Sequence, residues 1–389
     1  MTAAEPSPPG DSLGDGAAGM ALLPFERART DDPAAVAVAH QWAKRMTTGT
    51  VAAHPDLASL FRGAPAVAFA LHTSGQPAYA RALDSLDEHI VTLTRYRLQA
   101  AHDRIDEGRL PAVREFDLIS GLTGIGAYLL HRDRHSQLLR EVLAYLVRLT
   151  EPVQVDGDTL PGWWSAAPPA DRPAEDWPGG HGNLGLAHGA AGPLALLATA
   201  MRHGTTVPGQ EAAMATIGQW FDRCRVGAGR AAWWPGRITL AEQRTGVITQ
   251  DGPQRPSWCY GTPGQARAQQ LAALALGDLQ RRQQAEDAFA GCVTDDRQLV
   301  LLRDNSLCHG FAGLVLAAWR AAADAAPGNE LAVVVPRLRT RLEQRLHIEG
   351  SPDSGGLLEG EAGTRLAGHT VDTDQPEATQ WDLCLLLSG

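Results

Sequence analysis

Residues 308–319, CHGFAGLVLAAW, combine a Gly-x-x-Gly turn with the start of an apolar helix. Five other segments of the 389-residue chain resemble this one: FRGAPAVAFAL, ISGLTGIGAYLL, LAHGAAGPLALL, CYGTPGQARAQ and LLEGEAGTRLAG. The intervals between successive turns are 49 to 72 residues, counted from their first glycines, Gly63, Gly121, Gly189, Gly261, Gly310 and Gly360. Each interval has room for two helices and their loops, so the pattern indicates an internal repeat. The first turn departs from it, because Ala66 stands where the second glycine is expected.

The segments between the turns have the period of amphipathic helices. Apolar residues recur at spacings of three to five in residues 77–105, and residues 137–149 show a similar stripe. The repeats resemble one another at one end only, so we expect six equivalent turns to converge on a common face. This arrangement favours a closed ring over an open solenoid. The sequence therefore predicts an all-α fold, an α/α toroid of six helix-pair repeats.

Two stretches fall outside the helical pattern. Residues 1–20 are rich in Pro, Gly, Ala, Ser and Asp, and we expect them to form a disordered tail. Residues 21–389 are then the toroid. Within it, residues from about 224 to 254 carry β-formers such as Trp233, Ile238 and Val247 between Gly and Pro residues. We expect a small strand-containing insertion there, near the functional site of the toroid.

The overall composition excludes several classes of protein. The chain is 44% apolar and 20% charged, which is typical of a globular protein. A formal charge of −10 leaves no basic stripe for phosphates, so we expect no nucleic-acid partner. Five cysteines are a poor match to a secreted disulfide framework, and we expect no signal peptide, because the N-terminus carries acidic residues and no basic or apolar region. No apolar run reaches the roughly 18 residues of a membrane span. We expect a cytoplasmic protein without a transmembrane segment.

Two cysteines precede glycine turns in neighbouring repeat units. These are Cys259 and Cys308, and His309 follows the second. If the units are equivalent, the two sulfurs face each other beside the imidazole. A Cys-Cys-His set selects zinc, and three protein ligands leave a fourth position open. The alternative is that both are buried, unreactive cysteines; the repeat context favours the metal. The remaining three lie outside the turns, and we expect them to be structural: Cys224, Cys292 and Cys384.

Three further polar residues lie at or just before the turns. His188 precedes Gly189 in the register that His309 has in its own turn. That match favours a functional role over an ordinary structural histidine, whereas nearby His181 lies before the turn. Asp117 stands among apolar residues, where an ionised carboxylate is costly unless it is paired or used, and a helix cap is the alternative. Arg255 is either a surface arginine or a group that complements negative charge.

Four segments together resemble a known family: FDLISGLTGIG, GNLGLAHGAAG, RPSWCYGTPG and LCHGFAG. In this order they are similar to motifs of the lanthionine synthetase C-like proteins, specifically the stand-alone lanthipeptide cyclases. The resemblance covers nearly the whole chain after the N-terminal tail. It implies an α/α toroid with a catalytic zinc and, in some members, a small SH2-like insertion that residues 224–254 would represent. Carried over position by position, it implies the zinc ligands Cys259, Cys308 and His309 and the active-site residues His188, Asp117 and Arg255.

The resemblance also implies an activity. A zinc-bound thiolate of a dehydrated precursor peptide adds to a dehydroalanine or dehydrobutyrine, which closes a lanthionine or methyllanthionine ring. His188 would protonate the α-carbon, while Asp117 would take the thiol proton or orient the histidine, and Arg255 would stabilise the enolate or the aspartate; these assignments are interchangeable from sequence. The chain leaves no room for a dehydration domain, so a separate dehydratase is the expected partner. Two alternatives stay open: a relative that adds glutathione to dehydroamino acids, and a non-catalytic zinc-stabilised scaffold that binds peptides.

Overall fold

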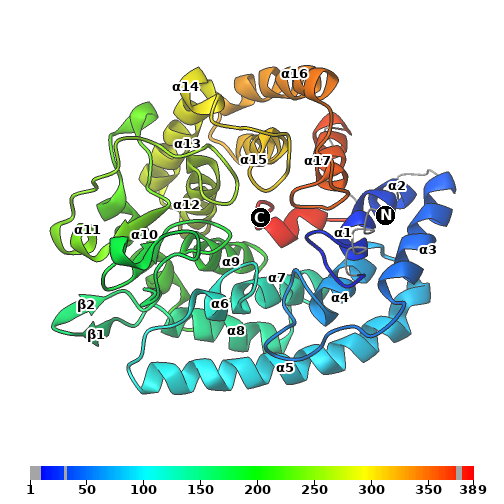
Figure 1. Ribbon diagram of the computed structural model, residues 1–389, viewed down its shortest axis with the longest axis horizontal. Coiled ribbons are helices and arrows are strands. Elements are labelled where there is room, and N and C mark those ends of the chain that lie inside the picture. Colours follow the sequence, from blue (N-terminus) through cyan, green and yellow to red (C-terminus); the bar gives the residue numbers. More distant parts are fainter. Residues whose placement is uncertain (1–9, 30–32, 374–378) are drawn as a thin grey trace, which may run out of the picture.

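Helices surround the centre of the molecule in two layers (Figure 1). The computed structural model describes residues 10–29, 33–373 and 379–389. Six inner helices each begin at one of the predicted glycine turns: α4 (Ala64–Thr73), α7 (Leu122–Arg132), α9 (Ala191–Arg202), α12 (Thr262–Leu276), α15 (Phe311–Ala323) and α17 (Glu361–Thr373). Outside them lie α3 (Pro33–Met46), α5 (Ala80–Asp106), α8 (Gln137–Arg148), α10 (Gln210–Cys224), α13 (Leu279–Thr294) and α16 (Leu331–Glu349). The predicted α/α toroid is confirmed.

One more glycine turn lies at the N-terminus, in GAAG at residues 16–19. It leads into α1 (Ala17–Met20) and α2 (Leu22–Arg29), which pack between α17 and α4 and complete the inner layer. Leu13 is fully buried there. The prediction of a disordered tail is therefore wrong for residues 10–20, while residues 1–9 lie outside the described part of the chain. A stretch of Gly, Ala and Asp has little apolar surface of its own, and only the repeat register indicates that it folds.

In several turns the second glycine permits a close backbone approach. A Cβ atom on Gly124, Gly264 or Gly313 would lie only 1.9–2.1 Å from the carbonyl oxygen of the residue six positions earlier. Gly19 has the same relation to Leu13, at 2.1 Å. Any side chain at these positions would force the turn open, which explains why glycine recurs there.

Hydrogen bonds between backbones link neighbouring turns around the ring. Leu118 N donates to the carbonyl of Ala187 at 3.1 Å, and Leu186 N to that of Cys259 at 2.9 Å. Cys259 N donates to Cys308 O at 3.3 Å, and Cys308 N to Leu358 O at 2.7 Å. The residues just before the glycines are thus held side by side on one face of the toroid.

The remaining elements are short. Strands β1 (Val153–Val155) and β2 (Asp158–Leu160) form an antiparallel hairpin, and β3 (His181–Asn183) pairs antiparallel with β4 (Arg237–Thr239). The other helices are α6 (Val113–Phe116), α11 (Leu240–Thr245) and α14 (Asp296–Leu299), with 3-10 turns at Pro77–Tyr79, Ala174–Asp176, Gly229–Ala231 and Trp381–Leu385. The predicted insertion at 224–254 contributes β4 and α11. That is too little regular structure for a separate SH2-like domain, and β4 completes its sheet with a strand outside the insertion.

The C-terminal segment closes the middle of the ring (Figure 1). Trp381 is fully buried, and Arg267 on α12 donates from Nε and Nη2 to the carbonyl of Leu387 at 2.9 and 2.7 Å. Arg267 is 1% exposed, and its charge is balanced by Asp324, whose carboxylate accepts from Nη2 at 2.6 Å. The C-terminal segment therefore fills space between the inner helices.

Candidate metal centre and active site

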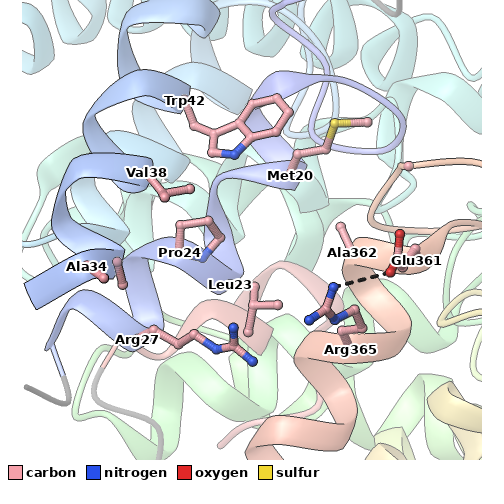
Figure 2. Close-up of a pocket in the computed structure, with 12 residues that line it drawn as sticks. Met20, Leu23, Pro24, Arg27, Ala34, Val38, Trp42, Glu361, Ala362 and Arg365 are labelled. Atoms are coloured by element: carbon pink, nitrogen blue, oxygen red, sulfur yellow. Dashed lines mark hydrogen bonds and ion pairs between the residues drawn. The ribbon is translucent and has the colours of Figure 1, made fainter. Parts of the chain in front are cut away.

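A cavity of about 630 Å³ opens on the face where the glycine turns meet. Its walls include all three predicted metal ligands, together with His188 and Arg255. A second cavity, of about 430 Å³, lies between α2, α3 and α17 and is mainly apolar (Figure 2). Its described lining contains neither cysteine nor histidine, and Arg365 pairs with Glu361 at its edge. The chemistry therefore belongs to the first cavity.

The two predicted thiol ligands lie on neighbouring turns that are joined by the backbone hydrogen bond from Cys259 N to Cys308 O, at 3.3 Å. The neighbouring Cys308 thiol lowers the pKa of Cys259 to about 6, helped by the Ser257 hydroxyl 3.5 Å away and by the positive charge of Arg255. The Cys259 thiol and burial in turn raise the pKa of Cys308. Of this thiol pair, Cys259 is therefore the one that loses its proton more readily.

His309 lies between two carboxylates at the cavity wall. Its Nε2 is 3.5 Å from Asp304, and its Nδ1 is 3.7 Å from Glu359. One ligand atom each of Cys308, His309 and Glu359 lie within 4.8 Å of one another, whereas Cys259 is not part of that group. The structure therefore places Cys259 beside Cys308, and Cys308 beside His309. It also places the Glu359 carboxylate there, which was not predicted from the sequence.

His188, on the turn next to that of Cys259, forms a pair with Asp117. The imidazole Nδ1 is 2.5 Å from Oδ2 of Asp117, and the other carboxylate oxygen accepts from the backbone N–H of Ser120 at 2.8 Å. Asp117 is 1% exposed, while the His188 side chain is 38% exposed and lines the cavity. Since the carboxylate engages Nδ1, the nitrogen left for a ligand is Nε2.

Arg255 lies directly upstream of the Cys259 turn. Its backbone carbonyl accepts from Ser257 N at 2.8 Å, and its side chain lines the cavity. Its positive charge contributes to lowering the pKa of Cys259 and of Asp304. Arg255 therefore lines the cavity, and its role towards negative charge there stays a prediction.

Tyr260 is a cavity residue that sequence reasoning missed. Its hydroxyl accepts from Nδ2 of Asn183 at 3.1 Å and from Nη2 of Arg237 at 3.3 Å. The Arg237 guanidinium also stacks over its ring at 4.8 Å, and the His188 ring is 6.1 Å away. A signal existed in the sequence. Tyr260 and Glu359 directly precede the first glycines of their turns, the register that singles out His188.

The three cysteines expected to be structural, and His181, lie outside this cavity. Cys292 is 1% exposed and Cys224 is 3% exposed, and burial raises the pKa of each thiol, that of Cys224 to about 12. Cys384 is fully buried in the C-terminal plug. His181 belongs to β3, and its Nδ1 donates to the carbonyl of Ala167 at 2.9 Å. None of the four lines the cavity of the thiol pair.

Comparisons with known proteins place this arrangement in a family. A family model described as lanthionine synthetase C-like protein matches residues 7–386. The nisin biosynthesis protein NisC of Lactococcus lactis subsp. lactis is 26% identical over 264 residues, which is 66% of this chain and 60% of that protein. The match therefore spans less than two thirds of the relative's length.

A solved structure titled nisin cyclase superimposes with a TM-score of 0.79 and 23% sequence identity. The match covers 97% of this chain and 92% of that one, so the folds correspond over their whole length. Within the described residues, no helix is long and apolar enough to cross a membrane. With the family match extending over nearly every residue, this chain belongs to the lanthionine synthetase C-like proteins.

Proposed function

We propose that the protein is a zinc-dependent lanthipeptide cyclase. It would add cysteine thiolates of a dehydrated precursor peptide to dehydroalanine or dehydrobutyrine residues of the same peptide, which closes lanthionine and methyllanthionine rings. The family membership supports this activity, as does the similarity to proteins named for nisin biosynthesis and nisin cyclisation. One observation carries the proposal: the two thiols, His309 and His188 line a single cavity, and the buried Asp117 pairs with His188 behind its wall.

The donor set fits zinc. Two thiols on neighbouring turns, with an imidazole on the residue next to one of them, are the soft and borderline ligands that zinc prefers. We assign the metal to Cys259, Cys308 and His309, with both thiols deprotonated on binding. Glu359 has a side chain that is 68% exposed, so its carboxylate can turn away into solvent and does not close the site permanently. Zinc held there supplies a Lewis acid that keeps a bound substrate thiol in its thiolate form at neutral pH.

His188 supplies the proton that completes the addition. When the substrate sulfur bonds to the β-carbon, the electron pair of the carbon–carbon double bond moves to the α-carbon and its carbonyl as an enolate. A protonated His188 delivers its Nε2 proton to the α-carbon, and the buried Asp117 holds Nδ1–H and complements the ring's positive charge. This assigns the histidine as the acid and the aspartate as the group that orients it.

Arg255 and the Tyr260–Arg237 pair line the same cavity as His188. A guanidinium or a tyrosine hydroxyl in such a place stabilises charge that develops on an enolate oxygen. The donors of Tyr260 and Arg237 are fixed by their mutual contacts, so little reorganisation is needed when that charge appears. We assign Arg255 to the negative charge near the thiols and Tyr260 to the position of the acceptor residue.

The substrate must reach the protein already dehydrated. The residues assigned here account for thiol addition and protonation, and none of them activates a serine or threonine hydroxyl as a leaving group. We therefore assign dehydration to a separate enzyme and expect the two to act on the same peptide. The five free cysteines suit a reducing compartment, and we place the reaction in the cytoplasm.

Metal analysis combined with an in vitro reaction tests the proposal. The zinc-loaded protein is mixed with a synthetic peptide that carries one dehydroalanine and one cysteine, and free thiols are then alkylated and detected by mass spectrometry. We expect one zinc per chain and loss of the alkylatable thiol without a change in peptide mass. Retention of the free thiol with the zinc-loaded protein, or adducts with added glutathione in place of a ring, would contradict the proposed activity.

A further inference from the structure

The active-site cavity continues into a second chamber. This chamber has a volume of about 460 Å³ and shares four lining residues with the active-site cavity: Asp171, His188, Arg237 and Tyr260. Because His188 borders both spaces, a peptide that reacts beside its imidazole has neighbouring residues at the entrance of the chamber. Volumes of this size are ordinary for ligand pockets.

The walls of the chamber are chemically unlike those of the thiol side. Besides polar side chains such as Arg114 and Asn183, its lining includes small apolar residues from two segments: Ala112, Val113, Ala167, Pro168, Pro169 and Ala170. The two prolines have no backbone N–H, so this stretch of wall offers few donors to a polar ligand. Ala112, Ala167 and Ala170 are exposed to solvent, and covering them with an apolar group would remove apolar surface from water.

Specific contacts hold in place the loop of residues 165–171, which contains Pro168 and Pro169 and is called the proline loop. The Nδ1–H of His181 donates to the carbonyl of Ala167 at 2.9 Å, and the backbones of Ser165 and His181 exchange hydrogen bonds of 3.0 and 2.8 Å. At the junction with the active site, Nη1 of Arg237 pairs with Asp171 at 2.9 Å. The chamber is thus formed before a ligand arrives, which lowers the entropic cost of binding.

We propose that this chamber is a specificity subsite that binds an apolar side chain of the substrate peptide, one or two residues from the dehydroamino acid. The inference rests on the proposed function, because it takes the substrate to be a peptide reacting at His188. Its ligand class follows from the apolar walls, and its distance from the reacting residue follows from the shared border. The ring-forming cysteine would bind at the proposed metal site of Cys259, Cys308 and His309, none of which lines the chamber.

The test compares two synthetic peptides that differ only beside the dehydroalanine, where one has leucine and the other glycine, in versions with that residue before or after it. Burial of a leucine side chain predicts that the wild-type protein prefers the leucine peptide about 10- to 100-fold in kcat/KM at one of these positions. Ala112→Phe and Ala170→Phe, which fill the chamber from its two walls, should each reduce this ratio to less than about 3-fold. A change in the ratio separates loss of the subsite from a general loss of activity.

Ala362→Phe is the matched control. It makes the same substitution in the cavity between α2, α3 and α17, and the preference ratio should stay at the wild-type value. Circular dichroism and zinc content verify that each variant is folded and loaded. A wild-type ratio near one at every position, or an unchanged ratio in both filled variants, would refute the subsite while cyclisation itself stands. If the zinc-loaded wild type cyclises neither peptide, the proposed function fails and the subsite fails with it.

Discussion

Replacing Asp117 with asparagine tests how the His188 pair works. The substitution keeps the volume of the side chain but leaves only one oxygen for two donors. The carboxylate now accepts from Ser120 N with Oδ1 and from His188 Nδ1 with Oδ2. If the amide oxygen stays on Ser120 N, the amide NH₂ faces Nδ1, which must then lose its proton, and a protonated imidazolium is disfavoured. If the amide turns over, two donors meet at Ser120 in a buried position.

Either outcome has a calculable cost. A buried unsatisfied donor costs about 1–3 kcal/mol, and loss of a positioned general acid costs about 10²- to 10⁴-fold in rate. We expect Asp117→Asn to lose at most a few kcal/mol in free energy of unfolding, to keep its zinc, and to cyclise at least about 100-fold more slowly. The assay is alkylation of residual thiols over time, at saturating peptide, with zinc measured on the same sample.

A matched substitution separates this effect from a general loss of stability. Asp87 also accepts from two side chains, the Tyr128 hydroxyl and Arg132 Nε, but it lies away from the active-site cavity. Asp87→Asn should destabilise the protein to a similar degree and leave the rate of cyclisation near that of the wild type. An Asp117→Asn protein that is folded, zinc-loaded and within about fivefold of the wild-type rate would refute the assigned acid.

Three other outcomes follow from the contacts described above. In elemental analysis, bound zinc should fall well below one per chain in both Cys259→Ala and Cys308→Ala. The control Cys292→Ala alters a buried thiol outside the cavity and should retain the zinc. Equal zinc contents in all three variants would contradict the ligand assignment. Glu359→Gln should weaken zinc binding about 10- to 100-fold in competition with a chromophoric chelator, since carboxylates beside a metal site orient its ligands, and an unchanged affinity would remove Glu359 from the site. Burial raises the pKa of Asp324, but the pair with Arg267 outweighs this and lowers the pKa to about 2, so the contribution of Asp324 to stability is present above pH 4 and is lost as pH falls towards 2. In urea unfolding, the stability of Asp324→Asn should therefore change with pH by about 2 kcal/mol less than that of the wild type in this window. An identical pH dependence of the two proteins would argue against the pairing.

The toroid could be predicted because the glycine turns recur in the sequence and reveal its repeat. Second glycines such as Gly124, Gly264 and Gly313 leave no space for a Cβ atom, so the period is visible in one sequence even though the first turn has Ala66 at this position. The turn at residues 16–19 obeys the same demand at Gly19, yet composition alone made its surroundings look unable to fold. Its stability comes from packing between the last and first inner helices, which are distant in sequence. The short strands were predicted only in part for a similar reason, since β4 is completed by β3 from another unit.

The functional site, like the fold, could be predicted from the sequence only in part. The register of the turns predicts that Cys259 and Cys308 meet, because neighbouring turns are joined by backbone hydrogen bonds. It does not indicate which of the residues in that register work together, and so Tyr260 and Glu359 were overlooked. The His188–Asp117 contact joins residues 71 positions apart, and no local sequence pattern predicts it. Arg237 and the proline loop reach the cavity from outside the repeat, where the sequence carries no period to follow.

X-ray absorption at the zinc edge tests the central claim most directly. The purified protein, with one zinc per chain, is measured alone and with an excess of a cysteine-containing peptide that lacks a dehydroamino acid. The account predicts two sulfur neighbours at about 2.3 Å together with nitrogen or oxygen neighbours, and three sulfurs once the peptide is present. A zinc that shows fewer than two sulfurs, or whose surroundings do not change when the peptide thiol is added, would contradict it.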